Sequence, residues 1–173
     1  MKLAPGEAFP DVDLPDHTGR ARTLSEVVGG DPTALVFSRG WWCPKEQQFL
    51  RRLVELQDDA EVAYARFVCV SVDPSETQAA FRAGLGARWI FLSDSERRYL
   101  DALKLREGTD TLNHPYAPTV ALIDPELTIR GLWNGYWYWG RPSTAELWQS
   151  FRHLSEALHR AEWVPPREPV QGG

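Results

Sequence analysis

The chain has 173 residues, of which 43% are hydrophobic and 25% are charged, and its formal net charge is −5. This length is enough for one core and too short for two comfortable domains, and the apolar content excludes a chain that is disordered throughout. The negative charge argues against nucleic acid or an anionic membrane as the main partner. The apolar runs are too short for a transmembrane helix, and the N-terminus lacks the apolar core of a signal peptide. We expect a cytoplasmic domain at residues 1–162, followed by a flexible tail at residues 163–173.

The predicted elements alternate between strands and helices along the chain. A short strand near Val12 and Leu14 precedes a helix that a capping box opens at Thr23 and two glycines end at residues 29–30. Continuous apolar runs predict buried strands at residues 33–38, 67–72, 89–92 and 119–123, the last forming a hairpin with residues 127–133. Helices are expected after residue 43, from Asp73-Pro74, from Ser93-Asp94 and from Ser143-Thr144-Ala145-Glu146. This order predicts an α/β fold, a central sheet with helices on both faces.

One cysteine lies where a buried strand leads through a short loop into a helix. Proline is favoured in the first helical turn, so Cys43-Pro44 places Cys43 at or beside the N-cap. Its sulfur would face unpaired backbone N–H groups and the positive end of the helix dipole, which favour the thiolate. Glu46 is placed to accept a hydrogen bond at the cap or to orient a nearby arginine.

Cys43-Pro44-Lys45-Glu46 resembles the Cys-Pro-x-Glu signature of peroxiredoxins, the alkyl hydroperoxide reductase/thiol-specific antioxidant (redoxin) family. The similarity covers about residues 4–160. Further matching segments are residues 5–10, 70–73, 91–94 and 117–120. The resemblance implies a thioredoxin-like fold with a central mixed sheet, and a peroxidase that attacks peroxides with a cysteine thiolate. It also implies that Pro118 is a cis-proline packed beside Cys43.

Two positions depart from the family pattern. Gly40 stands where peroxiredoxins typically carry the threonine or serine that binds peroxide, and Ala117-Pro118 stands near the site of their arginine. Arg39 and Arg141 are candidate substitutes. Lowering a thiol pKa from about 8.5 to ~6 raises the thiolate fraction at pH 7.4 only about 13-fold, so a fast peroxidase needs donors for the leaving oxygen. The departures predict weakened peroxidase activity.

The two cysteines are expected to differ in role. Cys69 lies inside an apolar strand and is predicted to be a buried structural residue. Glu46 and Gln48 occupy the positions of possible second cysteines, so the sequence predicts a one-cysteine cycle in which an external thiol or a thioredoxin-type protein reduces Cys43 sulfenic acid. A Cys43–Cys69 disulfide would contradict this. We expect no cofactor and no metal.

Two segments leave alternatives open. His114 is either a donor near the site or a solvated loop residue. The aromatic segment at residues 133–142 either covers the sheet edge or forms a surface for a homodimer or a bulky thiol.

The sequence therefore predicts a thiol-dependent peroxidase that reduces hydrogen peroxide or organic hydroperoxides, with Cys43 as nucleophile. The supporting residues are Arg39, Gly40, Trp42, Pro44, Glu46 and Pro118. The alternatives are a monothiol thiol–disulfide oxidoreductase and a non-catalytic redox-sensing or binding module on the same fold.

Overall fold

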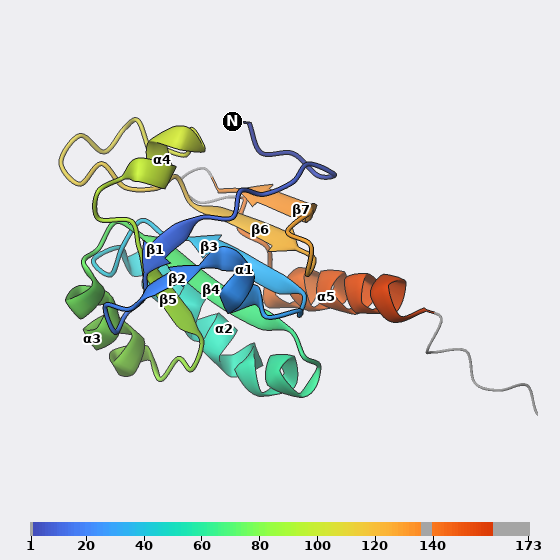
Figure 1. Ribbon diagram of the computed structural model, residues 1–173. Coiled ribbons are helices and arrows are strands. Elements are labelled where there is room, and N and C mark those ends of the chain that lie inside the picture. The colour runs from blue at the N-terminus through green and yellow to red at the C-terminus, as the bar shows by residue number, and fades with distance from the viewer. Residues whose placement is uncertain (1, 136–139, 161–173) are drawn as a thin grey trace, which may run out of the picture.

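The computed structural model describes residues 2–135 and 140–160, and a five-stranded mixed sheet forms its centre. The strand order is β5-β4-β3-β6-β7 (Figure 1). The strands are β3 (Thr33–Phe37), β4 (Arg66–Ser71), β5 (Ile90–Ser93), β6 (Thr119–Ile123) and β7 (Ile129–Asn134). β3, β4 and β5 run parallel, whereas β6 pairs antiparallel with β3 and β7 pairs antiparallel with β6. The predicted mixed sheet with its terminal hairpin is confirmed.

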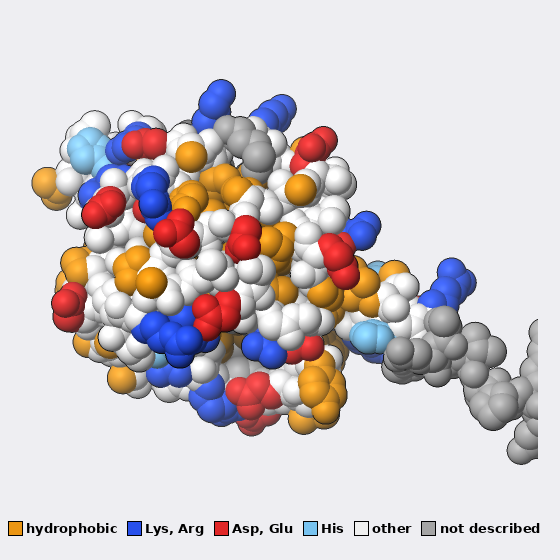
Figure 2. Space-filling view, in the orientation of Figure 1, with side chains coloured by type: hydrophobic (Ala, Val, Ile, Leu, Met, Phe, Trp, Pro, Cys, Tyr) orange, Lys and Arg blue, Asp and Glu red, His pale blue; other side chains and the backbone are white. Residues whose placement is uncertain are grey.

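Helices cover both faces of the sheet, as predicted. On one face lie α2 (Pro44–Val62), α3 (Ser75–Leu85) and α5 (Thr144–His159). On the other lie α1 (Leu24–Val28), α4 (Arg98–Ala102) and a small hairpin of β1 (Asp13–Pro15) and β2 (Ala21–Thr23). Figure 1 shows this hairpin in front of the sheet, and Figure 2 shows basic and acidic side chains interspersed over the same face.

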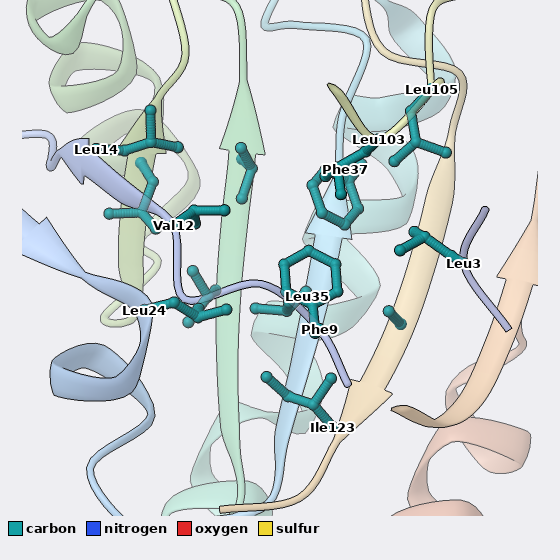
Figure 3. Close-up of a cluster of buried hydrophobic side chains, with 14 of the residues drawn as sticks. Leu3, Phe9, Val12, Leu14, Leu24, Leu35, Phe37, Leu103, Leu105 and Ile123 are labelled. Atoms are coloured by element: carbon teal, nitrogen blue, oxygen red, sulfur yellow. The ribbon is translucent and has the colours of Figure 1, made fainter. Parts of the chain in front are cut away.

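Two hydrophobic clusters, one on each face, explain why the central strands are continuously apolar. Along β3, Leu35 and Phe37 belong to the cluster under α1 and α4, whereas Ala34 and Val36 belong to the cluster under α2 and α5. Figure 3 shows Phe9 beside Leu35 and Phe37 in the first cluster. Since both faces of β3 are buried, successive positions must all be apolar.

α3 begins slightly later than the sequence predicts, because the expected capping aspartate binds other groups. The helix starts at Ser75 with Pro74 as its N-cap. The Asp73 carboxylate instead accepts hydrogen bonds from the Trp41 N–H and the Ser71 hydroxyl. Asp73 therefore ties the end of β4 to the loop that follows β3.

α4 also begins later than expected. It starts at Arg98, after a left-handed turn at Arg97 (φ 59°), rather than directly after Ser93-Asp94. The Asp94 carboxylate accepts hydrogen bonds from the backbone N–H groups of Tyr99 and Leu100. Although Asp94 lies outside α4, it therefore stabilises the N-terminal end of this helix.

The predicted capping box at Thr23 and the predicted helix cap at Ser143 differ in outcome. Thr23 accepts the Glu26 N–H at the start of α1, but the Glu26 carboxylate pairs with Arg20, so only half of that box forms. The box of Ser143 and Glu146 is complete at the start of α5. β2 was not predicted, since its three residues are too few to show a strand pattern.

Within residues 2–135 and 140–160, no helix has the length and apolar character needed to cross a membrane. The predicted tail at residues 163–173 lies outside the described residues, as do positions 136–139 of the aromatic segment.

Candidate active site

The fold places Cys43 at the start of α2, as the sequence predicts. Cys43 is the N-cap (φ −82°, ψ 115°) and Pro44 is the first helical residue. The Cys43 N–H donates to the Gly40 carbonyl at 3.2 Å, and the Cys43 carbonyl accepts the Gln47 N–H at 3.0 Å. The thiol therefore sits at the positive end of a 19-residue helix, where first-turn N–H groups lack helical partners.

The Cys43 side chain is nearly enclosed. Only 3% of the residue is exposed, and its sulfur makes no capping hydrogen bond. Trp41 is half exposed, whereas Trp42 is intermediate. Access to the sulfur is therefore limited to small molecules or requires a local movement of the loop before α2.

The loop before Cys43 depends on a glycine. Gly40 has φ +134°, and a Cβ atom there would lie 2.8 Å from Trp42 Nε1 and 3.1 Å from Asp73 Oδ2. The neighbouring Trp41 N–H donates to Asp73 Oδ2 at 3.0 Å, and the Gly40 N–H donates to Ser38 Oγ at 3.2 Å. The close approach of this loop to Asp73 explains why no side chain is present at position 40.

Glu46 lies in the first turn of α2 and is only 1% exposed. It forms an ion pair and a hydrogen bond with Arg141, which lies just before α5 and 95 positions away in the sequence. Burial raises the pKa of the Glu46 carboxyl, while the guanidinium of Arg141 opposes that rise. Arg39 adds a second nearby positive charge. Glu46 thus joins the start of α2 to two arginines.

Arg39 is held by partners of its own. Its Nη2 donates to Asp110 Oδ2 at 3.0 Å, and its guanidinium lies over the Trp42 ring at 5.1 Å from the centroid. The Nε atoms of Arg39 and Arg141 are both buried and have no hydrogen-bond partner among the residues that the structure describes. Arg39 belongs to the loop before Cys43 and Arg141 contacts Glu46 in the first turn of α2, so each brings an unused donor close to the start of this helix.

Pro118 lies near the site, but not in the predicted conformation. It precedes Thr119, which pairs with Phe37 at the end of β3, and it lines a pocket together with Arg39 and Lys45. No peptide bond in the described ranges is cis, so the expected cis-proline is wrong. The trans form is the lower-energy isomer of most X–Pro bonds, and the adjacent Ala117 N–H donates to the Leu105 carbonyl at 2.6 Å in this arrangement.

Cys69 is buried, as predicted. It lies on β4 in the hydrophobic cluster under α2 and α5. Burial raises the pKa of the Cys69 thiol well above its usual value, and the negative charges of Glu46 and Asp73 add to the effect. Both cysteines are reduced.

His114 is exposed, and its backbone carbonyl accepts a hydrogen bond from Arg97. This matches the solvated-loop alternative. Within the described ranges, no group of three or more His, Cys, Asp or Glu side chains is arranged to hold a metal ion.

Sequence reasoning missed Asp73 and Asp110 as neighbours of the cysteine loop. Asp73 could have been found, because the carboxyl ends of parallel β3 and β4 lie at the same sheet edge. Asp110 lies in a long loop, and nothing in its local sequence indicates that it reaches Arg39.

The family model described as the AhpC/TSA family matches residues 5–132. A relative named as a peroxiredoxin in Mycobacterium tuberculosis is 29% identical over 127 residues, which are 72% of this chain and 80% of the relative.

Solved structures show the same fold. The crystal structure of peroxidoxin BcpB from Mycobacterium tuberculosis matches with a TM-score of 0.74 at 22% identity, covering 87% of this chain and 95% of that one. Reduced Prx3 from Vibrio vulnificus in complex with hydrogen peroxide matches with a TM-score of 0.78 at 18% identity, covering 88% and 98%. The chain therefore belongs to the AhpC/TSA family and is a peroxiredoxin-type oxidoreductase with a thioredoxin fold.

Proposed function

We propose that this protein reduces hydrogen peroxide or organic hydroperoxides through Cys43, in a one-cysteine cycle completed by an external thiol. The observation that carries the proposal is the position of Cys43 at the N-cap of α2. Glu46 lies in the first turn of the same helix and forms an ion pair with Arg141. The Cys43 thiolate attacks one peroxide oxygen, the O–O bond breaks, and the other oxygen leaves as water or an alcohol. Sulfur loses two electrons and becomes a sulfenic acid.

The donors for the leaving oxygen differ from the threonine and arginine expected from the family. The first-turn N–H groups of α2 supply a positive field, and Arg141 and Arg39 each carry an unused Nε donor nearby. Donors of this kind matter because each one that stabilises developing negative charge is worth about 10²–10³ in rate. We assign Arg141, held by Glu46, as the principal side-chain donor.

Two features support a one-cysteine cycle. A resolving cysteine attacks as a thiolate, and the raised pKa of the Cys69 thiol opposes this. Position 46, where a second cysteine would make a Cys-x-x-Cys motif, instead holds the buried glutamate that binds Arg141. The sulfenic acid then needs an outside reductant, and a cytoplasmic pool of reduced thiols would supply it.

The second candidate is a redox-sensing or binding module without turnover. The near-complete burial of Cys43 favours it, because a peroxide must reach the sulfur. A homodimer through residues 133–142 remains a separate proposal, and a monomer in sedimentation at micromolar concentration would exclude it.

The decisive experiment mixes the reduced protein with peroxide and follows tryptophan fluorescence by stopped flow, since Trp41 and Trp42 adjoin Cys43. The unaltered protein and Cys69→Ser should give a fluorescence change whose rate rises with peroxide concentration. Cys43→Ser should give none. Mass spectrometry should find one added oxygen on Cys43 and no Cys43–Cys69 disulfide.

A rate no greater than that of a free thiol would favour the sensing or binding module. Loss of the response in Cys69→Ser, with a Cys43–Cys69 disulfide in the unaltered protein, would overturn the one-cysteine cycle while leaving the peroxidase.

A further inference from the structure

A pocket of about 470 Å³ opens beside the cysteine loop. One side of it comes from the residues around Cys43, which contribute Arg39 and Lys45. The other side comes from the loop between α4 and β6, which contributes Glu107, Asp110 and Leu112. In Figure 1 this loop projects beside α4, away from the central sheet. The volume falls within the range of small-molecule sites and far exceeds what hydrogen peroxide needs.

Glu107 is the unusual residue of this pocket. It is only 8% exposed, yet within the described part of the chain no cation forms an ion pair with it. Its Oε1 accepts the Thr109 N–H at 3.1 Å and the Thr109 hydroxyl at 2.8 Å. No hydrogen bond to its Oε2 is found among the described residues. A buried carboxylate without a cation is costly, so a positively charged ligand group would stabilise it.

The same pocket also contains positively charged side chains. Arg39 forms an ion pair with Asp110, which leaves its guanidinium only partly neutralised. Lys45 lies in the first turn of α2. A molecule with an ammonium group and a carboxylate therefore finds a partner for each charge within one pocket. Arg39 and Lys45 lie on either side of Cys43 in the sequence, four residues before it and two residues after it.

We propose that this pocket binds the reducing thiol, and that the thiol is a small zwitterionic aminothiol such as a cysteine-containing amino acid or short peptide. Its ammonium pairs with Glu107 and its carboxylate with Lys45 and Arg39. This inference rests on the proposed function, because it names the reductant of that cycle.

The reductive steps balance with two thiols. The first thiol attacks the Cys43 sulfenic sulfur, an S–S bond forms, the S–O bond breaks, and water leaves with the thiol proton. The second thiol attacks the mixed disulfide, which releases the ligand disulfide and returns Cys43 as a thiol. Two thiols are oxidised for each peroxide reduced.

The test uses the full chain and four small thiols that differ in charge type. Cysteamine carries an ammonium, mercaptopropionate a carboxylate, cysteine both, and mercaptoethanol neither. Cys43 is first oxidised with one equivalent of peroxide, and the rate of reduction by each thiol is then measured. Each rate is divided by the mercaptoethanol rate of the same variant, so that changes in the intrinsic reactivity of Cys43 cancel.

Glu107→Gln should lower the cysteamine and cysteine ratios about tenfold and leave the mercaptopropionate ratio within about twofold. Lys45→Gln should lower the mercaptopropionate and cysteine ratios instead. Glu126→Gln, an identical change at an exposed position in the β6–β7 turn, should alter no ratio. The rate of oxidation by peroxide should be unchanged in Glu107→Gln.

Unchanged ratios in Glu107→Gln, or equal slowing with all four thiols, would overturn the pocket assignment. Absence of the oxidation step in the unaltered protein would overturn the proposed function instead. In that case Cys43 is converted to a mixed disulfide with a nitrobenzoate thiol, and the same three ratios are measured for the release of that thiol. Ratios that are equal in Glu107→Gln and in the unaltered protein then reject the pocket.

Discussion

At Gly40 the backbone adopts φ +134°, a conformation that residues with a side chain avoid. A Cβ atom would also contact Trp42 Nε1 and the Asp73 carboxylate. The threonine or serine of typical peroxiredoxins therefore does not fit this loop. The departure from the family pattern is a property of the loop geometry, and donors must come from elsewhere.

Gly40→Ala should destabilise the protein by about 1–3 kcal/mol, because it adds both backbone strain and a steric contact. Gly84→Ala is the matched control. Gly84 lies within α3 with no atom near its Cβ position, so alanine there should stabilise by about 0.5–1 kcal/mol. Urea unfolding measures both changes. Equal stability of the two variants would contradict the strain at Gly40.

Glu46 and Arg141 form the buried ion pair of the site. Glu46→Gln leaves the Arg141 guanidinium without its counter-charge, and we expect a loss of about 3 kcal/mol in the free energy of unfolding. Because burial raises the pKa of Glu46, the unaltered protein loses stability as pH rises from the unfolded pKa of about 4.3 to the folded pKa, and Glu46→Gln does not. The loss caused by the substitution should therefore be greater at about pH 5 than at pH 8. Urea denaturation across that range measures it.

Arg141→Met should behave differently with pH. Burial already raises the pKa of Glu46, and removal of Arg141 raises it further. Between the unfolded pKa of about 4.3 and the raised folded pKa, the native state binds more protons, so its stability falls as pH rises, by at most about 1.4 kcal/mol per pH unit. The variant should therefore lose less stability at about pH 5 than at pH 8. A loss independent of pH would show that Glu46 is not the group responsible.

At the scale of elements, the start of α5 matters for the site because Arg141 lies only two residues before its N-cap, Ser143. Ser143 accepts the Glu146 N–H at 3.1 Å, and Glu146 accepts the Ser143 N–H at 2.8 Å. This reciprocal cap fixes the direction in which the chain enters the helix. The cap thereby helps to place the arginine over Glu46.

Ser143→Ala should lower the free energy of unfolding by about 1 kcal/mol, the usual value of an N-cap side chain. Ser150→Ala in the same helix is the control. Ser150 donates only to the Glu146 carbonyl inside the helix, so its loss should have little effect. Thermal unfolding distinguishes the two, and a larger effect at Ser150 would contradict the role of the cap.

The whole molecule is one sheet with a separate hydrophobic cluster on each face. Leu53 of α2 belongs to one cluster and Ile129 of β7 to the other, and both are fully buried. The sheet backbone separates them. Cavities made on opposite faces should therefore act independently.

Leu53→Ala should cost about 3 kcal/mol and Ile129→Val about 1 kcal/mol. The double variant should lose the sum to within about 0.5 kcal/mol and should still unfold in one transition. Urea unfolding of the four proteins tests this. A marked departure from additivity would mean that the sheet transmits strain between its faces.

The sequence by itself determined most of the elements and the position of the nucleophile. The apolar runs of β3, β4 and β6 and the Cys43-Pro44 helix start are local signals, because burial on both faces and the first helical turn each select residue types within a short window. Cys69 was recognisable as buried for the same reason.

Only the tertiary structure decided which groups surround Cys43. The Glu46–Arg141 pair joins residues 95 positions apart, and the Arg39–Asp110 pair joins residues 71 apart. Contacts of this kind depend on how α2, α5 and a long loop pack around the sheet, and no short-range pattern encodes them. The hydrogen-bond partners of Asp73 were mispredicted for that reason, since its carboxylate accepts the N–H of Trp41, 32 positions away. The isomer of Pro118 was mispredicted as well.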